Sequence, residues 1–290
     1  MLITVFTPAY NRKNLLTRLY ESLCKQTYKD FEWVIVDDGS TDETKELSQT
    51  LSEREETFFP LRYFYQENGG KHRAINHGVR EAQGELFFIA DSDDMLPPNA
   101  LETVAKGYKG IAHNHSFAGL CGLDGYLSGG LIGSGLPKDA IDATSIDIRF
   151  KYGVTGDLKE VFRTDVLKEY PFPQIEGERF CPEMLVWNRI ASKYKLRFIN
   201  QVIYLAEYQD DGITSRIVKA RMNSPVASMM TYAELNSYDI PFLSKVKAAI
   251  NYWRFRFCSD AAEKPRLAWW WNWTAPFGYF MHLNDLRQLR

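Results

Sequence analysis

Three carboxylates follow directly on a short apolar run. Residues 86–90 (LFFIA) have the length and composition of a buried strand, and Asp91, Asp93 and Asp94 come immediately after them. Charges this close to a core are costly unless a positive group lies among them. Oxygen-only ligands suit hard cations, and open α/β sheets bind ligands at the carboxyl ends of their strands. We therefore interpret the cluster as a Mg2+ or Mn2+ site for a phosphate-bearing substrate; a solvated acidic turn is the alternative.

Two other apolar runs also end in polar residues. Residues 31–36 (FEWVIV) lead into Asp37 and Asp38, and the first run, residues 2–6, leads into residues 7–11 (TPAYN). The carboxyl ends of parallel strands lie at one edge of a sheet, so we expect these three segments to converge. This convergence predicts a site more strongly than any single motif does.

The elements that must position these residues alternate along the chain. Leucines recur at helical spacing over residues 15–23, and a helix start with capping residues lies at 41–44. Residues 61–65 are the third expected strand in chain order, and residues 74–79 show another helical pattern. This alternation of strands and helices predicts an α/β protein with a mostly parallel sheet and right-handed crossovers.

Four segments, taken together, resemble a known family. TVFTPAYNR (4–12), VIVDDGSTD (34–42), NGGKHRAINHG (68–78) and FIADSDD (88–94) occur in the order and at the spacing typical of family-2 glycosyltransferases. The resemblance is strong over residues 1–100 and looser to about residue 216. It implies the GT-A fold, a Rossmann-like, mostly parallel sheet flanked by helices, here followed by a C-terminal helical appendage. It also implies an inverting transfer of a sugar from a nucleotide donor.

The resemblance places the nucleoside of the donor against the first two segments. Tyr10 offers a flat face on which a base can stack, although an ordinary half-buried aromatic residue is the simpler interpretation. Asp37 and Asp38 can accept hydrogen bonds from a uracil N–H or a ribose hydroxyl, and we expect one of the two to cap the turn into the next helix. The nucleoside contacts implied are Thr7, Pro8, Ala9, Tyr10, Asn11, Asp37 and Asp38.

The third segment is expected to face the diphosphate. Gly69 and Gly70 allow a close backbone approach, and Lys71 can act there as a point charge. A tight turn with a solvated lysine is the alternative. Arg73 competes with Lys71 for this role, and Asn76 also matches the family pattern.

The fourth segment is the implied metal site. By resemblance, Asp93 is the direct ligand of Mn2+ or Mg2+ on the diphosphate. Asp91 contacts the ribose or a metal-bound water and is the second metal-site residue, and Ser92 contacts the donor beside them.

An inverting transfer also needs a base that takes the proton from the acceptor hydroxyl. The family usually shows Glu-Asp at the start of a helix, with an arginine six residues after the Asp. Here Pro182 and Glu183 stand in that place, and Arg189 follows six residues after Glu183. Since proline suits the first turn of a helix, we predict Glu183 as the general base, with Glu178 in reserve. The alternative is that Glu183 only favours the helix N-terminus through the dipole.

The chain is expected to divide into three parts. Residues 1–100 bind the nucleotide sugar, residues 101–216 form the acceptor-binding half of the same domain, and residues 217–290 form a helical, aromatic and basic region. The polar segment 208–216 either closes over the donor, with Arg216 near the diphosphate, or is a plain surface loop.

The C-terminal residues 245–290 differ in composition from the rest. They contain eight basic and three acidic residues around the segment 267–280 (LAWWWNWTAPFGYF), which is too short and too interrupted for a spanning helix. Tryptophan and tyrosine prefer the headgroup level, and basic residues favour anionic lipid. We predict a peripheral membrane anchor; packing on the protein's own core, or on the partner of a homodimer, is the alternative.

The overall composition limits the class of protein and the compartment that we expect. The 290 residues, 45% hydrophobic and 25% charged, suffice for one large core with an appendage, and the net charge of -2 shows no nucleic-acid signature. Four scattered cysteines are typical of reduced thiols, and the N-terminus starts in a strand without a signal-peptide pattern. We therefore expect a cytoplasmic protein, either free or peripheral on the cytoplasmic face of the membrane.

These patterns and the resemblance predict one function over two others. The prediction is an inverting, metal-assisted transfer of a sugar from a nucleotide diphosphate, most simply UDP, to a hydroxyl of a glycan or lipid-linked glycan. A nucleotidyltransferase that makes sugar nucleotides would carry a glycine-rich basic loop after the first strand, which residues 7–12 (TPAYNR) lack. The third alternative is a non-catalytic nucleotide-binding or membrane scaffold protein, and the presence of both DSDD and Glu183 argues against it.

Overall fold

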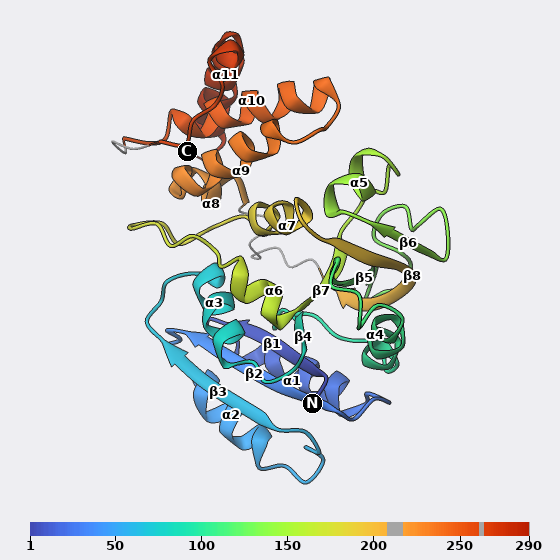
Figure 1. The fold of residues 1–290 in the computed structure, drawn as a ribbon. Coiled ribbons are helices and arrows are strands. Elements are labelled where there is room, and N and C mark those ends of the chain that lie inside the picture. Colours follow the sequence, from blue (N-terminus) through green and yellow to red (C-terminus); the bar gives the residue numbers. More distant parts are fainter. Residues whose placement is uncertain (208–216, 261–263, 290) are drawn as a thin grey trace. The chain divides into compact units, whose positions relative to one another are not determined.

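The computed structural model describes residues 1–207, 217–260 and 264–289 (Figure 1). Its contacts divide the chain into two compact units. The first contains residues 1–171 and 190–207, and the second contains residues 172–189 together with the described residues from 217 onward. In this division, residues 172–189, which the sequence places in the acceptor-binding half, group with the C-terminal helices.

The first unit is built on one sheet. Among the described residues, eight strands pair in the order β3-β2-β1-β4-β7-β5-β8-β6. Strands β1, β2, β3 and β4 pair in parallel, as do β5 and β8, whereas β7 runs antiparallel between β4 and β5, and β6 pairs antiparallel with β8. The α/β fold class predicted from the sequence is confirmed. The strands are β1 (Ile3–Ala9), β2 (Phe31–Asp38), β3 (Leu61–Gln66), β4 (Leu86–Ile89), β5 (Phe117–Tyr126), β6 (Ala140–Ala143), β7 (Leu158–Arg163) and β8 (Lys195–Ala206).

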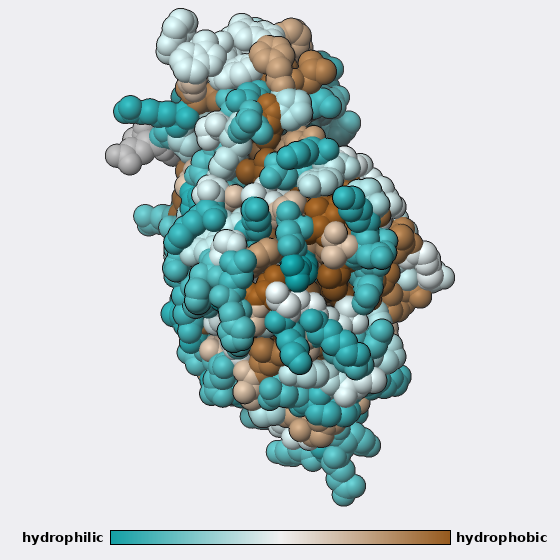
Figure 2. Space-filling model, turned by 45° about the vertical axis from the view of Figure 1, so that its right-hand side comes forward, coloured by the Kyte–Doolittle hydropathy of each residue, from teal (hydrophilic) through white to brown (hydrophobic). Residues whose placement is uncertain are grey.

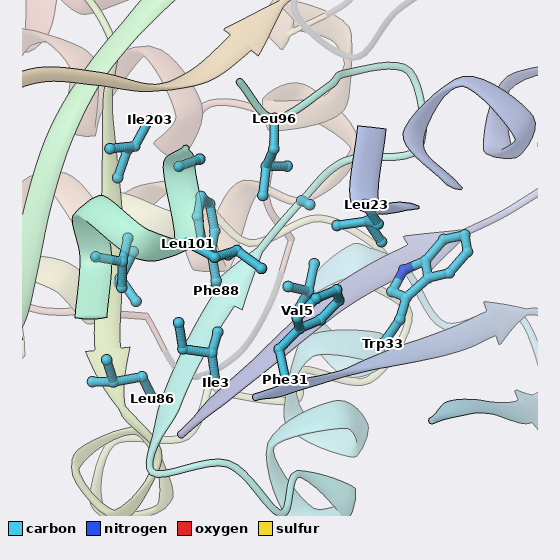
Figure 3. Packing of buried hydrophobic residues seen from close by; sticks show 14 of the residues in the cluster. Ile3, Val5, Leu23, Phe31, Trp33, Leu86, Phe88, Leu96, Leu101 and Ile203 are labelled. Atoms are coloured by element: carbon cyan, nitrogen blue, oxygen red, sulfur yellow. The ribbon is translucent and has the colours of Figure 1, made fainter. Parts of the chain in front are cut away.

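Helices cover both faces of the parallel half of this sheet. Alternation along β1 turns Ile3 and Val5 to the face on which α1 and α4 pack, and Figure 3 shows Leu23 and Leu101 of these helices pointing onto it. The opposite face is covered by α3. The helices of this unit are α1 (Lys13–Cys24), α2 (Thr44–Ser52), α3 (Lys71–Glu81), α4 (Ala100–Lys109), α5 (Ser145–Phe150) and α6 (Thr164–Glu169).

A glycine allows α3 to approach the sheet. A Cβ at Gly78 would lie 2.2 Å from the Phe6 ring, which in turn stacks on Phe87 with 4.9 Å between the ring centroids. Any larger residue at 78 would push α3 away from the strands. The close approach therefore fixes where the N-terminus of α3 meets the ends of β1 and β4.

The second unit is helical. Its elements have a core of their own, formed by Met229, Tyr232, Ala248, Tyr252 and Phe255. The C-terminal helical region expected from the sequence is present, and no helix among the described residues is long and apolar enough to cross a bilayer. The elements are α7 (Glu183–Ala191), whose last two residues belong to the first unit, α8 (Ile217–Asn223), α9 (Pro225–Ser237), α10 (Phe242–Arg256), the 3-10 helix η2 (Trp269–Thr274) and α11 (Ala275–Gln288).

Candidate active site

The chain segments after β1 and β2 are joined at the sheet edge. Asn11, whose backbone lies in the left-handed region with φ 54°, accepts a hydrogen bond from the Thr41 backbone N–H at 2.8 Å. Its own N–H donates to Ser40 Oγ at 2.8 Å. The neighbouring Tyr10 is 48% exposed, so its ring face is free to stack against a planar group. Asn11 therefore holds the two loops together, while Tyr10 faces outward.

The two aspartates that end β2 are bound within the protein. Asp37 accepts from the Ser40 backbone N–H at 2.8 Å and from the Tyr63 hydroxyl at 2.6 Å, so it is the one that holds the turn, as expected for one of the pair. Both residues lie inside the strand rather than after it. Gly39 follows with φ 81°, and a Cβ there would lie 2.7 Å from the Asn68 backbone nitrogen. The turn therefore requires glycine.

Asp38 fastens the glycine loop that precedes α3. Its carboxylate accepts from the backbone N–H groups of Gly69 and Gly70 at 2.8 and 2.7 Å. The Gln66 side chain donates to it at 2.7 Å and the Asn68 side chain at 3.3 Å. Only 4% of Asp38 is exposed. Its oxygens are thus occupied by this loop, which places the start of α3.

Lys71 and Asp91 bring the third and fourth motifs into contact. The Lys71 ammonium lies 2.7 Å from Asp91 Oδ1 and 3.0 Å from Oδ2. Burial acts to raise the pKa of Asp91, but the positive charges of Lys71 and Lys159 outweigh it, so that this pKa is lowered. The Asp91 carboxylate is therefore ionised. Both side chains remain about a quarter to a third exposed, at 27% and 30%.

Asp93 differs from its neighbours in lacking partners. Burial and the adjacent charge of Asp91 raise the pKa of Asp93, and no other described residue donates a hydrogen bond to its carboxylate. A divalent cation would relieve this repulsion between carboxylates. No group of three or more Asp, Glu, His or Cys in the described part of the chain is arranged to hold a metal by itself. The donor set therefore fits an ion that takes one or two carboxylates and completes its coordination with phosphate oxygens and water, as Mg2+ does.

The turn that carries these aspartates is supported by β8. The Tyr204 hydroxyl donates to Asp94 Oδ2 and accepts from the Asp91 backbone N–H, both at 2.7 Å. The Glu207 backbone N–H donates to Asp94 Oδ1 at 3.0 Å. Burial and the charge of Asp91 raise the pKa of Asp94 to about 6. Asp94 is thus a structural member of the acidic cluster, whereas Asp93 is free to bind.

Charged residues of β5 and β7 lie next to Tyr204, which supports this turn. Asp124 of β5 pairs in register with Tyr204, and the Lys159 ammonium of β7 lies 3.4 Å from the centre of the Tyr204 ring. Asp124 is 5% exposed, and its Oδ1 has no hydrogen-bond partner. Burial raises the pKa of Asp124 to about 7, against the opposing effect of Lys159. Sequence reasoning missed Tyr204, Asp124 and Lys159, because each is a single polar residue in a strand and belongs to no motif.

The remaining predicted donor contacts fall into two groups. Thr7 and Ser92 are buried, and Thr7 Oγ1 accepts a hydrogen bond from the Trp33 indole N–H at 2.9 Å. Ala9 is also buried, and Pro8 is partly exposed beside it. On α3, the Arg73 side chain runs alongside Gly69, where a Cβ would lie 2.6 Å from Arg73 Cδ, and Asn76 is buried on the same helix. Arg216 lies outside the described residues.

The two candidate bases belong to the second unit and have different environments. Glu178 is buried, and its carboxylate accepts from the backbone N–H groups of Val226 and Ala227 at 2.6 and 2.9 Å. These donors are in the first turn of α9, so Glu178 caps that helix. Glu183 is the first residue of α7 and is partly exposed. Arg189, six residues later, makes two hydrogen bonds to Glu234 of α9, at 2.8 and 2.6 Å.

Comparison with known proteins finds similar chains among glycosyltransferases. Residues 4–115 match the family model Glycosyl transferase family 2. The chain is similar to the GalNAc(5)-diNAcBac-PP-undecaprenol beta-1,3-glucosyltransferase of Campylobacter jejuni, with 29% identity over 73% of this chain and 67% of that protein. Other curated glycosyltransferases, from Rickettsia and Streptococcus pneumoniae, are 35–39% identical over 101–104 residues. These shorter alignments span only 16–34% of the relatives' own length.

Solved structures share the fold. Staphylococcus aureus TarS 1-349 in complex with UDP-GlcNAc is similar with a TM-score of 0.65 and 22% identity, over 89% of this chain and 73% of that one. The mannosyltransferase PcManGT from Pyrobaculum calidifontis, in complex with GDP-Man and Mn2+, gives a TM-score of 0.58 and 20% identity, over 96% and 73% of the two chains. At this level of identity the likeness establishes the common fold.

Proposed function

Since the chain is a family-2 glycosyltransferase with the GT-A fold, we propose that it catalyses an inverting transfer of a sugar from a UDP-sugar to a hydroxyl of a lipid-linked glycan. The observation that carries the proposal is the contact between Lys71 and Asp91, next to Asp93, whose carboxylate accepts no hydrogen bond from any other described residue. A positive and a negative group held together at the strand ends can bind a metal-diphosphate complex.

The donor and acceptor classes are suggested by relatives. The Campylobacter jejuni protein is named for a glycan on undecaprenol diphosphate, and the TarS structures hold UDP or UDP-GlcNAc. The PcManGT structure is a complex with GDP-Man and Mn2+. We extend to this chain a UDP-sugar donor, a lipid-linked glycan acceptor and a divalent ion, Mn2+ or Mg2+.

Each residue of the site then has a role in binding. Tyr10 stacks on the base, and the loop that Asp38 holds brings the backbone of Gly69 and Gly70 toward the diphosphate. Lys71 donates to diphosphate oxygens from the N-terminus of α3, where the helix dipole also favours an anion. Asp93, with Asp91, would hold a divalent ion, and that ion would supply positive charge to the leaving diphosphate.

The transfer also needs a base, and the proposed base is Glu183, the first residue of α7. It takes the proton from the attacking acceptor hydroxyl as the new bond to the anomeric carbon forms and the bond from that carbon to the diphosphate oxygen breaks. Glu178 is not available for this step in our proposal, because both of its oxygens accept hydrogen bonds from α9. The inverted configuration of the product follows from a single displacement.

The proposal is tested by following release of nucleoside diphosphate from a panel of sugar nucleotides, with Mn2+, with Mg2+ and with chelator. We expect metal-dependent release from one UDP-sugar, which Asp93→Asn lowers by at least about a hundredfold. Asp139→Asn is the matched control, since that aspartate is exposed and far from the motifs in sequence. Release of pyrophosphate would instead indicate a nucleotidyltransferase, and donor binding without release would indicate a non-catalytic protein.

A further inference from the structure

The C-terminal elements carry large apolar side chains on their outer surface. We define an aromatic face, all of it in the second unit. Its members have exposed fractions of 53–76%, values typical of polar surface residues. They are Phe242, Leu243, Trp269, Trp270, Trp273, Phe277 and Phe280.

Ring contacts join several members of this face. Trp271 lies beneath it, with its ring centroid 5.8 Å from Phe242 and 6.4 Å from Trp273. Trp273 lies 6.3 Å from Phe277 in turn, and Trp269 lies 6.0 Å from Trp270. In Figure 2, brown and pale atoms, those of hydrophobic and intermediate residues, gather at the upper end, where Figure 1 places α11. Phe242, Trp273 and Phe277 are thus linked through Trp271 across α10, η2 and α11.

The opposite side of α11 is firmly packed. Gly278 faces α10, where a Cβ would lie 2.5 Å from Trp253 Cβ, and the buried Asp285 accepts a hydrogen bond from Arg254 Nη2 at 2.6 Å. Phe277 and Phe280 are spaced at i and i+3 in α11, which places them on neighbouring positions of one side of the helix, and Trp273 of η2 contacts Phe277 there. The helix is therefore held by its inner face, and the exposure of its aromatic residues is a stable property of the folded unit.

Basic residues flank the aromatic face. Lys245 and Lys247 lie in the first turns of α10, and Lys264 and Arg266 precede η2. None of the four forms an ion pair with a described residue. The exposed acidic side chains that the structure describes in this part of the chain are Asp239 and Asp260, whereas Asp285 is buried and paired with Arg254. Among the described residues around the aromatic face, the four basic side chains therefore outnumber these two acidic ones.

We propose that the aromatic face docks this protein onto an anionic lipid surface. The indole and phenyl rings would enter the headgroup region, and the lysines and Arg266 would contact lipid phosphates. Protein interfaces are also rich in aromatic residues, but they are depleted of lysine, so the combination seen here favours lipid over a protein partner. The unit would lie on the membrane, since none of its described helices can cross it. The inference rests on the proposed function in one respect: a lipid-linked acceptor is found at such a surface.

The proposal is tested by flotation of the full chain with vesicles of phosphatidylcholine, either alone or containing phosphatidylglycerol. We expect the protein to float with the anionic vesicles and to be released by salt. The triple variant Trp273→Ser, Phe277→Ser, Phe280→Ser should lower the bound fraction at least about tenfold. Lys245→Gln with Lys247→Gln should lower it by a similar factor on anionic vesicles only. Tyr152→Ser, which removes an exposed aromatic side chain of the first unit, is the matched control.

Two results would overturn the proposal: wild-type protein that does not float, or a triple variant that floats equally well. Oligomeric state, measured by light scattering, shows whether the triple variant separates a dimer instead; that outcome would assign the face to a second copy of the chain. Circular dichroism confirms that the variants are folded. Flotation requires no turnover, and metal-dependent release of nucleoside diphosphate requires no membrane, so a failure here is distinct from a failure of the proposed function.

Discussion

The ammonium of Lys71 lies within 3.0 Å of both carboxylate oxygens of Asp91. Lys71 is the first residue of α3, and Asp91 follows the end of β4, so this ion pair ties a helix N-terminus to the acidic turn. The pair keeps the lysine pointing toward the carboxylates before any substrate arrives. Such preorganisation lowers the entropic cost of binding an anion.

Replacing this lysine should weaken donor binding more than it affects folding. In Lys71→Met, the KM for the UDP-sugar should rise about 10–100-fold, because the diphosphate loses a charge-assisted hydrogen bond. The partly exposed pair contributes little to stability. Steady-state kinetics and thermal unfolding measure the two effects. Lys106→Met is the control, since that lysine pairs with Glu102 on the surface of α4; an unchanged KM in Lys71→Met would remove the lysine from the donor site.

The carboxylate of Asp38 should be important for stability as well as for the site. Asp38→Ala leaves the N–H groups of Gly69 and Gly70 without their acceptor, so we expect a loss of about 2–4 kcal/mol in the free energy of unfolding. UDP affinity, measured by calorimetry where the variant is folded, should fall with it. Asp139→Ala, at an exposed aspartate, should change stability by about 0.5 kcal/mol or less. A variant of Asp38 as stable as wild type would contradict the role that the hydrogen bonds indicate.

Glu178 and Glu183 should separate into a structural and a catalytic residue. Glu178→Gln weakens the cap of α9, so we expect it to lower stability by about 1–2 kcal/mol while changing kcat little. Glu183→Gln should lower kcat by about a hundredfold or more and leave stability close to wild type. Denaturant unfolding and single-turnover kinetics distinguish the two variants. The reverse result, a large kcat loss in Glu178→Gln alone, would reassign the base.

The buried Asp124 should make stability depend on pH. Burial raises its pKa to about 7 in the folded protein, above the value near 4 of an unfolded chain, so the folded state retains a proton that the unfolded state has released. Stability should therefore fall as pH rises from about 4 to 7. Asp124→Asn should reduce this dependence, leaving the smaller part that comes from Asp94, and above pH 7 it should stabilise the protein by roughly 1–3 kcal/mol. Urea unfolding at pH 5.5 and 8.5 tests this, and a pH dependence unchanged in the variant would exclude Asp124 as its source.

The amino-acid sequence alone was sufficient to predict the parallel half of the sheet and the segments that meet at its edge. Short apolar runs at 31–36 and 86–90 predict buried strands, and the polar residues that follow such runs must lie at the carboxyl ends. Asp93 and Lys71 could be identified in this way because each belongs to a motif directly after a strand or a glycine pair. The local sequence pattern and the chain topology are enough to place these residues at the edge of the sheet.

The tertiary structure decided which polar groups are free. In the sequence, three acidic residues resemble binding or catalytic carboxylates: Asp37, Asp38 and Glu178. In the structure, Asp37 accepts a hydrogen bond within a turn, Asp38 accepts one from a glycine loop, and Glu178 accepts one from the N-terminus of α9. The support of the acidic turn by Tyr204 joins residues more than a hundred positions apart. No local pattern encodes such contacts, because hydrogen-bond partners and burial depend on which strands and helices pack together in three dimensions. The sequence therefore determines the types of residue at the site, and packing determines which of them remain able to bind.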